Sequence, residues 1–372
     1  MDYFFNLPTK IYFGNGSLKE LKEAKSLGRS ALLVTGKHFA KSSGLLKKVE
    51  SILVEEKIKT TEFCGVEENP SVETVEKGGE LARRKKCDFI IGLGGGSPMD
   101  AAKGIAVLAT NSGGLRKYFG SEKLKNSPLP ILAIPTTAGT GSEVTRYAVI
   151  NDWQDKTKKV VSSFSILPRI AIVDPSLTLT LPDNLTASTG MDAFSHALEG
   201  YLSSDANSLT DIFSQEAIKI IRESLLLLLK RKTLPLREKL SLASLYAGIV
   251  INHTGTIIVH GMGYPLTLDY GVQHGAANAL LLPYVMDYLG KKKVYQEKLK
   301  EILRTTKVKE SLLKLNRSLN LPLILKEIGV KRKDLKTLAR RAMKDCERAL
   351  LRISIPLKEN DFFLIYQEAF AG

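Results

Sequence analysis

The chain has 372 residues, and its 54 lysines and arginines exceed its 39 aspartates and glutamates by a formal charge of +15. Its hydrophobic share of 44% and charged share of 25% are typical of a globular protein and exclude a disordered or fibrous chain. The length predicts two domains, each large enough to bury a core. No apolar run reaches the roughly 20 residues of a membrane-spanning helix, and the N-terminus MDYFFNLPTK lacks the pattern of a signal peptide.

The three cysteines and the basic charge bear on location and partners. Cys64, Cys87 and Cys346 cannot form a disulfide framework and none lies in a CxxC motif, which favours a reducing cytoplasm. A charge of +15 is compatible with nucleic-acid binding. The basic residues recur at helical spacing among acidic ones, however, and no nucleic-acid-binding motif accompanies them. We therefore expect a solvated surface with no nucleic-acid or membrane partner, and keep nucleic-acid binding as the alternative from another class.

Short apolar runs alternate with amphipathic segments in the first half of the chain. Strands are predicted at 30–35, 60–64, 88–93, 129–134 and 170–173, and helices at 38–56, 71–86 and 99–110. This alternation predicts a parallel sheet covered on both faces. From residue 183 on, the periodicity is helical, as over 209–230 and 236–251, and no strand is predicted. We expect an α/β domain over residues 1–181 and an all-helical domain over residues 182–372.

A glycine-rich turn joins the strand at 88–93 to the following helix. Gly94, Gly95 and Gly96 have no side chain, so the backbone can approach a ligand closely. Pro98 suits the first turn of a helix, and the N–H groups of Gly95, Gly96 and Ser97 would face an anion at the helix N-terminus. The turn therefore predicts a phosphate or pyrophosphate site, although a tight turn alone would use the same residues.

A second loop of small residues, PTTAGTGSE at 135–143, also follows a predicted strand. Its hydroxyls and glycines could line a polar ligand, and an ordinary capped loop is the alternative interpretation. Ligands of parallel sheets bind at the carboxyl ends of the strands, so two such loops support each other.

The histidines suggest a metal site in the second half of the chain. Asp192 and His196 are four residues apart in a helical segment and share one face, as either metal ligands or a surface pair. His260 and His274 flank a segment that we interpret as a glycine-containing turn. Three imidazoles and a carboxylate suit a borderline divalent metal. We place His253 on the same helix face as His260 and interpret it as a packing residue, or as a residue that supports a ligand without binding the metal itself.

Several long motifs resemble the iron-containing (group III) alcohol dehydrogenases. They are GLGGGSPMDAAKGIAVLAT, AIPTTAGTGSEVT, TGMDAFSHALEGYLS and VHGMGYPLTLDYGVQHGAANALLLPYVM, in that order, and the resemblance runs in register from about residue 5 to 290. It implies a dinucleotide-binding α/β domain, a helical metal-binding domain and a site in the cleft between them. It also implies a homodimer.

The resemblance assigns roles to individual residues. The metal ligands would be Asp192, His196, His260 and His274, with ferrous iron usual and zinc as the other metal. No catalytic side chain is implied beyond these ligands. The cofactor would be held by Gly95, Gly96, Ser97, Pro98, Asp100, Thr136, Thr137, Thr140 and Ser142, with Asn69 and a lysine, Lys158 or Lys159, nearby.

Two positions depart from common patterns of that family. Members that prefer NAD resemble VTD after the first strand, where the carboxylate would repel a 2′-phosphate. Here Gly36 takes that position and Lys37 follows, which favours NADP over NAD. Many members have a second histidine four residues after His260, whereas this chain has Tyr264, which cannot carry a proton at neutral pH in the same way.

Together these features predict an alcohol dehydrogenase or aldehyde reductase that transfers hydride between NADP(H) and a small alcohol or aldehyde, such as butanol or 1,3-propanediol. The metal would polarise the substrate oxygen. A zinc-dependent polyol dehydrogenase of the glycerol type is the alternative within the superfamily. Metal-assisted hydrolysis by the same four ligands is a further alternative, which would need no nicotinamide.

Overall fold

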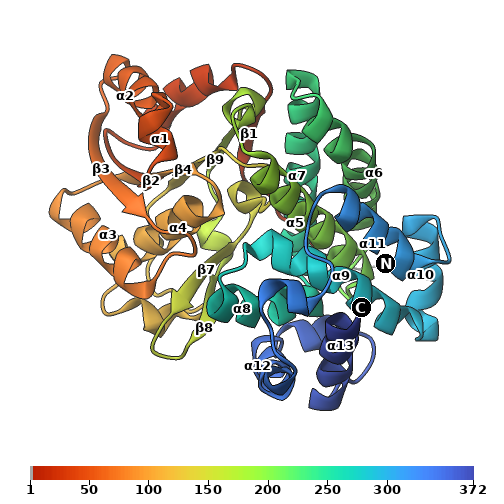
Figure 1. The fold of residues 1–372 in the computed structure, drawn as a ribbon. Coiled ribbons are helices and arrows are strands. Elements are labelled where there is room, and N and C mark those ends of the chain that lie inside the picture. Colours follow the sequence, from red (N-terminus) through yellow and green to blue (C-terminus); the bar gives the residue numbers. More distant parts are fainter. Residues whose placement is uncertain (1–2) are drawn as a thin grey trace. The chain divides into compact units, whose positions relative to one another are not determined.

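The computed structural model describes residues 3–372, which form two compact units (Figure 1). The first unit consists of Asn6–Thr137 and Gly141–Thr180 and is an α/β unit. The second consists of residues 3–5 with Ala138–Thr140 and Leu181–Gly372, and its regular elements are all helical. The predicted fold class is thereby confirmed.

A six-stranded parallel sheet forms the centre of the α/β unit. Its strand order is β1-β9-β6-β4-β2-β3, and every neighbouring pair is parallel. The strands are β1 (Lys10–Phe13), β2 (Ser30–Gly36), β3 (Lys59–Val66), β4 (Phe89–Gly94), β6 (Ile131–Pro135) and β9 (Ile170–Val173). The chain leaves β2 for β3 on one side and then returns to β4 on the other side, so the topological switch point lies between β2 and β4. Ligands of open α/β sheets bind outside the carboxyl ends of the strands at such a point.

Alternating side chains of the strands pack on opposite faces of this sheet. On β2, Leu32 and Val34 contribute to the core beneath α3 (Val72–Arg84) and α4 (Gly96–Thr110). Leu33 belongs instead to the core on the other face, which is covered by α1 (Phe39–Ser42), α2 (Leu45–Glu55) and the 3₁₀ helix η1 (Ser17–Ser26). Burial on both faces explains why these strands read as continuous apolar runs.

Local structure departs from the sequence expectations at several points. The segment predicted as one helix over 38–56 is two helices, because Gly44 adopts a left-handed φ of +75° between them. Neither the edge strand β1 nor the antiparallel pair β7 (Tyr147–Asp152) and β8 (Thr157–Ser162) was predicted. These two strands form a small sheet with β5 (Gly120–Ser121). The other 3₁₀ helices of this unit are η2 (Leu115–Tyr118), η3 (Ser142–Val144), η4 (Phe164–Ile166) and η5 (Pro175–Thr178).

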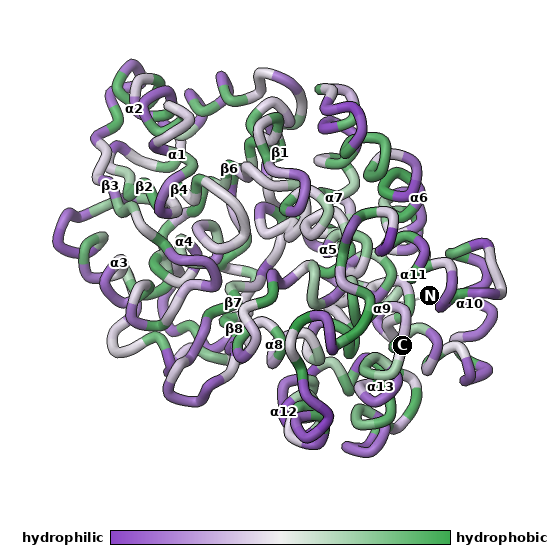
Figure 2. The backbone as a smooth tube through the Cα atoms, in the orientation of Figure 1, coloured by the Kyte–Doolittle hydropathy of each residue, from purple (hydrophilic) through white to green (hydrophobic). Residues whose placement is uncertain are grey.

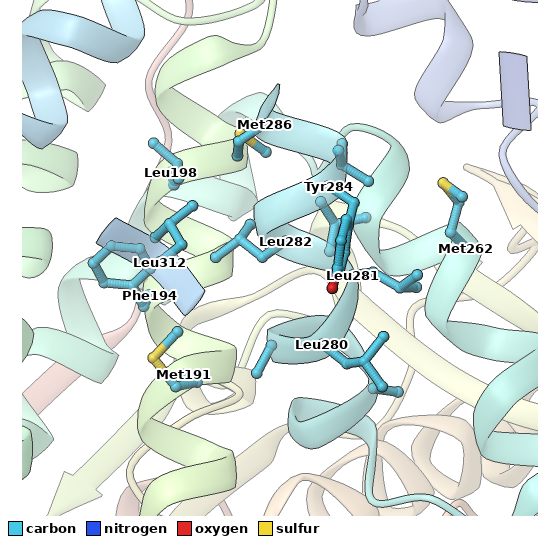
Figure 3. Packing of buried hydrophobic residues seen from close by; sticks show 14 of the residues in the cluster. Met191, Phe194, Leu198, Met262, Leu280, Leu281, Leu282, Tyr284, Met286 and Leu312 are labelled. Carbon is cyan, nitrogen blue, oxygen red and sulfur yellow. The ribbon is translucent and has the colours of Figure 1, made fainter. Parts of the chain in front are cut away.

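The helical unit is built around two almost fully buried helices. These are α5 (Asp183–Leu202) and α9 (His274–Gly290), which contact each other and supply most of the side chains labelled in Figure 3. Helix α9 has apolar, buried residues on almost all of its sides, as expected of a central helix. The other helices are α6 (Ser208–Lys230), α7 (Leu234–Thr254), α8 (Ile258–Tyr270), α10 (Lys293–Leu303), α11 (Val308–Ser318), α12 (Leu335–Asp345) and α13 (Glu359–Ala371), with η6 (Leu325–Ile328), η7 (Arg332–Asp334) and η8 (Ala349–Arg352).

Outer helices of this unit are amphipathic. Helix α12 buries Leu335, Leu338, Ala339 and Ala342 on one side, while its basic residues make it strongly hydrophilic in Figure 2. Its residues Lys336, Arg340 and Lys344 are exposed, so the positive charge of this helix lies on its solvated face.

Within the described residues, no single helix has the length and apolar composition needed to span a membrane, and one pair, α7 and α8, meets both criteria jointly across a bend of 109°.

Candidate functional site

The glycine-rich turn lies at the carboxyl end of β4, where Gly95 caps the N-terminus of α4 without a side-chain hydrogen bond. Gly94 has a φ of +146°, and a Cβ there would lie 2.8 Å from the side chain of Pro98. A Cβ on Gly95 would lie 3.3 Å from the side chain of Thr137. Glycine is therefore required at Gly94, whereas a side chain at Gly95 would need Thr137 to shift slightly. Gly95, Gly96 and Ser97 at the start of α4 are only half-buried. The observation fits the predicted pyrophosphate site.

Gly36 ends β2, which pairs with β4 at the topological switch point. A Cβ on Gly36 would make ordinary contacts of 3.7 Å with Pro98 and 3.8 Å with the carbonyl oxygen of Val66. The fold thus has room for a Cβ at this position, so packing around the Cβ does not require glycine here. Lys37 and Lys41 are exposed nearby in the chain, and the Lys41 ammonium lies 3.9 Å from the carboxylate of Glu62.

Asn69, Ser97 and Lys158 come together from three separate segments. Asn69 has a left-handed φ of +56°, its N–H donates to Ser97 Oγ at 3.0 Å, and its Oδ1 accepts from Lys158 Nζ at 2.8 Å. The alternative lysine of the sequence prediction, Lys159, instead pairs with Asp155 at 3.2 Å. Lys158 is therefore the lysine that is linked to the glycine-rich turn.

Asp100 and Ser142 belong to a buried polar network. The Ser142 hydroxyl donates to Asp100 Oδ1 at 2.6 Å, and the N–H of Val149 donates to Asp100 Oδ2 at 3.0 Å. Burial raises the pKa of Asp100. Both oxygens of the Asp100 carboxylate thus accept hydrogen bonds from the protein, and these bonds connect α4 to η3 and β7.

Lys103 completes this network and was not predicted from the sequence. Its wholly buried ammonium donates to Ser142 Oγ at 2.8 Å, Thr145 Oγ1 at 3.1 Å and the carbonyl oxygen of Tyr147 at 2.8 Å. Burial lowers its pKa to about 8, and burial raises the pKa of neighbouring Glu143 to about 7. The sequence signal that could have identified Lys103 is its position three residues after Asp100 on the same helix.

The remaining loop residues divide between the two units. The N–H of Thr136 donates to the carbonyl oxygen of Gly94 at 2.9 Å, and Thr137 lies beside Gly95. Thr140 belongs to the segment Ala138–Thr140, which packs with the helical unit.

Three of the four predicted metal ligands converge within the helical unit. Ligand atoms of Asp192 on α5, His260 on α8 and His274 at the start of α9 all lie within 4.8 Å of one another. Asp192 Oδ1 is 3.5 Å from His260 Nε2 and 3.9 Å from His274 Nε2. His260 Nε2 is buried and has no hydrogen-bond partner among residues 3–372. A buried carboxylate beside an unsatisfied imidazole nitrogen fits a divalent cation.

His196 lies beside this cluster, one helical turn after Asp192. Its ring stacks on that of His260 with 4.4 Å between centroids, and its Nδ1 lies 3.3 Å from the carbonyl oxygen of Gly139. A proton on Nδ1 can donate to that carbonyl, which leaves the lone pair of Nε2 available to a metal.

Burial and charge act in opposite directions on this cluster. Burial lowers the pKa of His196 to about 4, outweighing the attraction of Asp192. Burial also lowers the pKa of His260, but the carboxylates of Glu199 and Asp192 outweigh it and raise this pKa to about 9. For Asp192, burial raises the pKa, yet the three imidazoles outweigh it and hold the pKa well below its usual range. An ionised carboxylate among imidazoles suits cation binding, which would displace the proton on His260.

Two buried residues that touch the cluster were missed in the sequence. Glu199 hydrogen-bonds to Nδ1 of His260, and Asn278 Nδ2 donates to Asp192 Oδ1 at 2.9 Å. Glu199 follows His196 by three residues and Asn278 follows His274 by four, so helical spacing placed each on the face of a predicted ligand.

Two interpretations of the histidine segments are wrong. The segment 260–274 is not mainly a turn, because helix α8 continues to Tyr270 and only Gly271 to Gln273 separate it from α9. His253 does not share a helix face with His260, because it lies on α7, which meets α8 at 109°. His253 packs with its ring stacked 4.0 Å from that of Phe5.

Tyr264 lies one turn after His260 on α8, with its ring centroid 5.6 Å from that of His274. Burial raises the pKa of its phenol further above the ordinary value. The phenol therefore stays protonated at neutral pH, as the sequence argument required.

Comparisons with known proteins agree with this architecture. The family model of iron-containing alcohol dehydrogenase matches residues 8–175, and the model of the C-terminal domain of the Fe-containing alcohol dehydrogenase family matches residues 186–370. The chain is 38% identical to a 1,3-propanediol dehydrogenase of Klebsiella pneumoniae, over 98% of both chains. It is 36% identical to an NADPH-dependent butanol dehydrogenase of Clostridium saccharobutylicum, over 89% of this chain and 88% of the relative.

A solved structure of an iron-containing alcohol dehydrogenase from Thermotoga maritima superposes with a TM-score of 0.91, at 36% identity and with 100% of both chains covered. Both halves of the sequence and the complete fold thus match one family. The chain belongs to the iron-containing alcohol dehydrogenase family and is an oxidoreductase acting on alcohols.

Proposed function

We propose that the protein transfers hydride between NADP(H) and a small alcohol or aldehyde, with a ferrous ion held by Asp192, His196, His260 and His274. The names of the relatives support this substrate class, since they include a 1,3-propanediol dehydrogenase and an NADPH-dependent butanol dehydrogenase. Zinc is compatible with the same nitrogen and oxygen donors.

The observation that carries the proposal is the convergence of ligand atoms of Asp192, His260 and His274 within 4.8 Å. The buried Nε2 of His260, which lacks a hydrogen-bond partner among the described residues, supports it. When bound, the metal supplies Lewis-acid polarisation of the substrate oxygen, and the nicotinamide supplies the hydride chemistry.

The side chains of this cluster would bind the metal, and their hydrogen bonds would orient the ligand atoms toward it. With Nδ1 protonated, His196 would donate a hydrogen bond to the carbonyl oxygen of Gly139 and His260 would donate one to Glu199, so both imidazoles would direct Nε2 away from these acceptors. Asp192 supplies the negative charge. With Asp192 and His260 almost fully buried, water has little access to these two ligands.

The α/β unit would bind the cofactor at the switch point between β2 and β4. The N–H groups at the start of α4 would hold the pyrophosphate. Gly36 leaves room for a 2′-phosphate without a repelling carboxylate, and Lys37 supplies a positive charge next to it in the chain. This is the basis of the proposed preference for NADP over NAD.

We further propose a cytoplasmic homodimer with a small-molecule substrate and no nucleic-acid or membrane partner. Light scattering after gel filtration tests the dimer. A mass near twice 40.9 kDa is expected, and the monomer mass would contradict it.

The test of function is anaerobic reduction of butyraldehyde and 3-hydroxypropanal by metal-stripped protein reloaded with ferrous ion, with NADPH and NADH in parallel. We expect turnover that depends on the metal and is faster with NADPH. Metal-dependent turnover that is faster with NADH would contradict the cofactor preference alone. Absence of turnover with either cofactor would contradict the proposed substrate class.

A further inference from the structure

We propose that Glu199 is a positioning residue that holds the His260 imidazole in the tautomer and orientation needed for metal binding. The inference rests on the metal site proposed above and extends it to a residue that is not itself a ligand. Its carboxylate joins α5, which carries Asp192 and His196, to the start of α8, which carries His260.

Two hydrogen bonds give Glu199 this function. Its Oε1 accepts the N–H of Val259 at 2.8 Å, and its Oε2 is hydrogen-bonded to Nδ1 of His260. The N–H of Val259 belongs to the first turn of α8, whose own N-cap, Ile257, has no capping side chain. One carboxylate thus binds the backbone and the side chain of neighbouring residues, which fixes the imidazole relative to its helix.

The bond to Nδ1 decides which nitrogen of His260 is available to a metal. When the ring is neutral and Nδ1 donates its proton in a hydrogen bond to Glu199, the lone pair lies on Nε2, the atom that is 3.5 Å from Asp192 Oδ1. His196 has the same arrangement, but its acceptor is the uncharged carbonyl of Gly139. An imidazole that is hydrogen-bonded to a carboxylate also donates its lone pair to a metal more strongly than an imidazole that is hydrogen-bonded to a carbonyl oxygen.

The charge of Glu199 gives a second, independent argument. Its side chain is fully buried, and within residues 3–372 its ion pair is with His260 and with no lysine or arginine. A buried carboxylate without a permanent cation is strongly destabilising. In the metal-loaded protein, with all three imidazoles neutral, Asp192 and Glu199 would together supply two negative charges, which would balance one divalent cation. The two buried carboxylates therefore suit the protein in the state with a divalent metal bound.

A double-mutant cycle tests whether Glu199 acts through His260. The variants are Glu199→Gln, His260→Ala and their combination, each stripped of metal and titrated with Co²⁺ against a chelator. Glu199→Gln keeps the shape of the side chain but removes its charge and one of its two acceptors. Glu216→Gln on α6, whose side chain is 45% exposed and pairs with Lys219, is the matched control. Thermal melting and far-ultraviolet circular dichroism monitor the fold.

We expect Glu199→Gln to weaken Co²⁺ binding by about 10- to 100-fold and to change the visible absorption of bound Co²⁺. In the His260→Ala background the same substitution should have little further effect, and Glu216→Gln should bind like the unsubstituted protein. If Glu199→Gln does not fold, Glu199→Asp, which keeps the charge but shortens the reach, replaces it in the same cycle with the same expectation.

The alternative outcomes separate this inference from the proposed function. Tight Co²⁺ binding that Glu199→Gln leaves unchanged would overturn the role of Glu199 and leave the metal site standing. An equal loss with and without His260 would show that Glu199 acts by another route, which also overturns the inference. Failure of the unsubstituted protein to bind Co²⁺ would overturn the metal site and the inference together.

Discussion

The side-chain amide of Asn278 lies 2.9 Å from Oδ1 of Asp192, although 86 positions separate the two residues in the chain. Asn278 follows His274 by one turn of α9, and its Nδ2 is also 3.2 Å from Nε2 of that histidine. A single amide therefore links the carboxylate of α5 to the imidazole of α9. Such a contact fixes the carboxylate relative to the other donors before a metal binds.

Replacing Asn278 by alanine should weaken metal binding by about tenfold, because Asp192 loses a donor that orients it. Chelator competition with Co²⁺ measures the change. Asn316→Ala is the control, since this buried asparagine donates to the carbonyl oxygen of Ala279 in the same helical unit and touches none of the predicted ligands. Equal losses of affinity in both variants would indicate general destabilisation and contradict the orienting role.

Removing the metal should lower the melting temperature of the protein, because a ligand that binds only the folded state stabilises it by mass action. At a free metal concentration 1,000 times the dissociation constant, this stabilisation is about 4 kcal/mol. Differential scanning fluorimetry before and after chelation measures the shift. His274→Ala should show almost no shift and no activity. A His274→Ala protein that keeps both metal and activity would refute the ligand assignment.

Replacing Gly36 by aspartate should weaken NADPH binding roughly 100-fold relative to NADH, because a carboxylate would face the 2′-phosphate. The fold should tolerate the side chain, since a Cβ there approaches no atom closer than 3.7 Å. Gly36→Ala adds the Cβ without the charge and should change both affinities little. Dissociation constants from nicotinamide fluorescence titrations decide the matter. Equal effects of aspartate on the two cofactors would contradict the selectivity argument.

The pKa of Glu143 predicts a pH-dependent stability. Burial raises this pKa from 4.5 to about 7, so the folded state favours the protonated form. The resulting stabilisation is fully present below pH 4.5 and is lost as the pH rises through 7. The glutamine of Glu143→Gln stays neutral at every pH. The melting temperature of this variant should therefore rise relative to that of the unsubstituted protein as the pH increases from 5 to 8. The gain corresponds to at most about 3 kcal/mol. A difference that does not vary with pH would contradict the shifted pKa, and Glu216→Gln is the control.

Much of the α/β unit could be predicted from the sequence, because buried parallel strands are short apolar runs between turns. The run at 88–93 corresponds to β4, and its glycine-rich turn lies at the carboxyl end of that strand as expected. The strand order that makes this place a topological switch point was not predicted. The antiparallel pair β7–β8 was missed because β8 reads TKKVVS, without the alternation or apolar content of a typical strand. Its partner β7 packs against α4 and α3, and no local sequence pattern points to that packing.

For the candidate metal centre, the sequence by itself determined the pairs within one helix. Asp192 and His196 are four residues apart, and the 3.6-residue period of a helix is enough to bring both to one face. The family was also evident from motifs in the chain alone. The bend of 109° between α7 and α8, which separates His253 from the helix face of His260, was not evident from the sequence.

Only the tertiary structure decided the contacts between helices that orient the ligands. Glu199 reaches His260 across 61 positions and Asn278 reaches Asp192 across 86. Hydrogen bonds of this kind depend on how the buried faces of α5, α8 and α9 pack, and packing is set by the volumes of many apolar side chains together. Local spacing determines the face on which a polar side chain lies, whereas packing of the helices determines the atom that it meets.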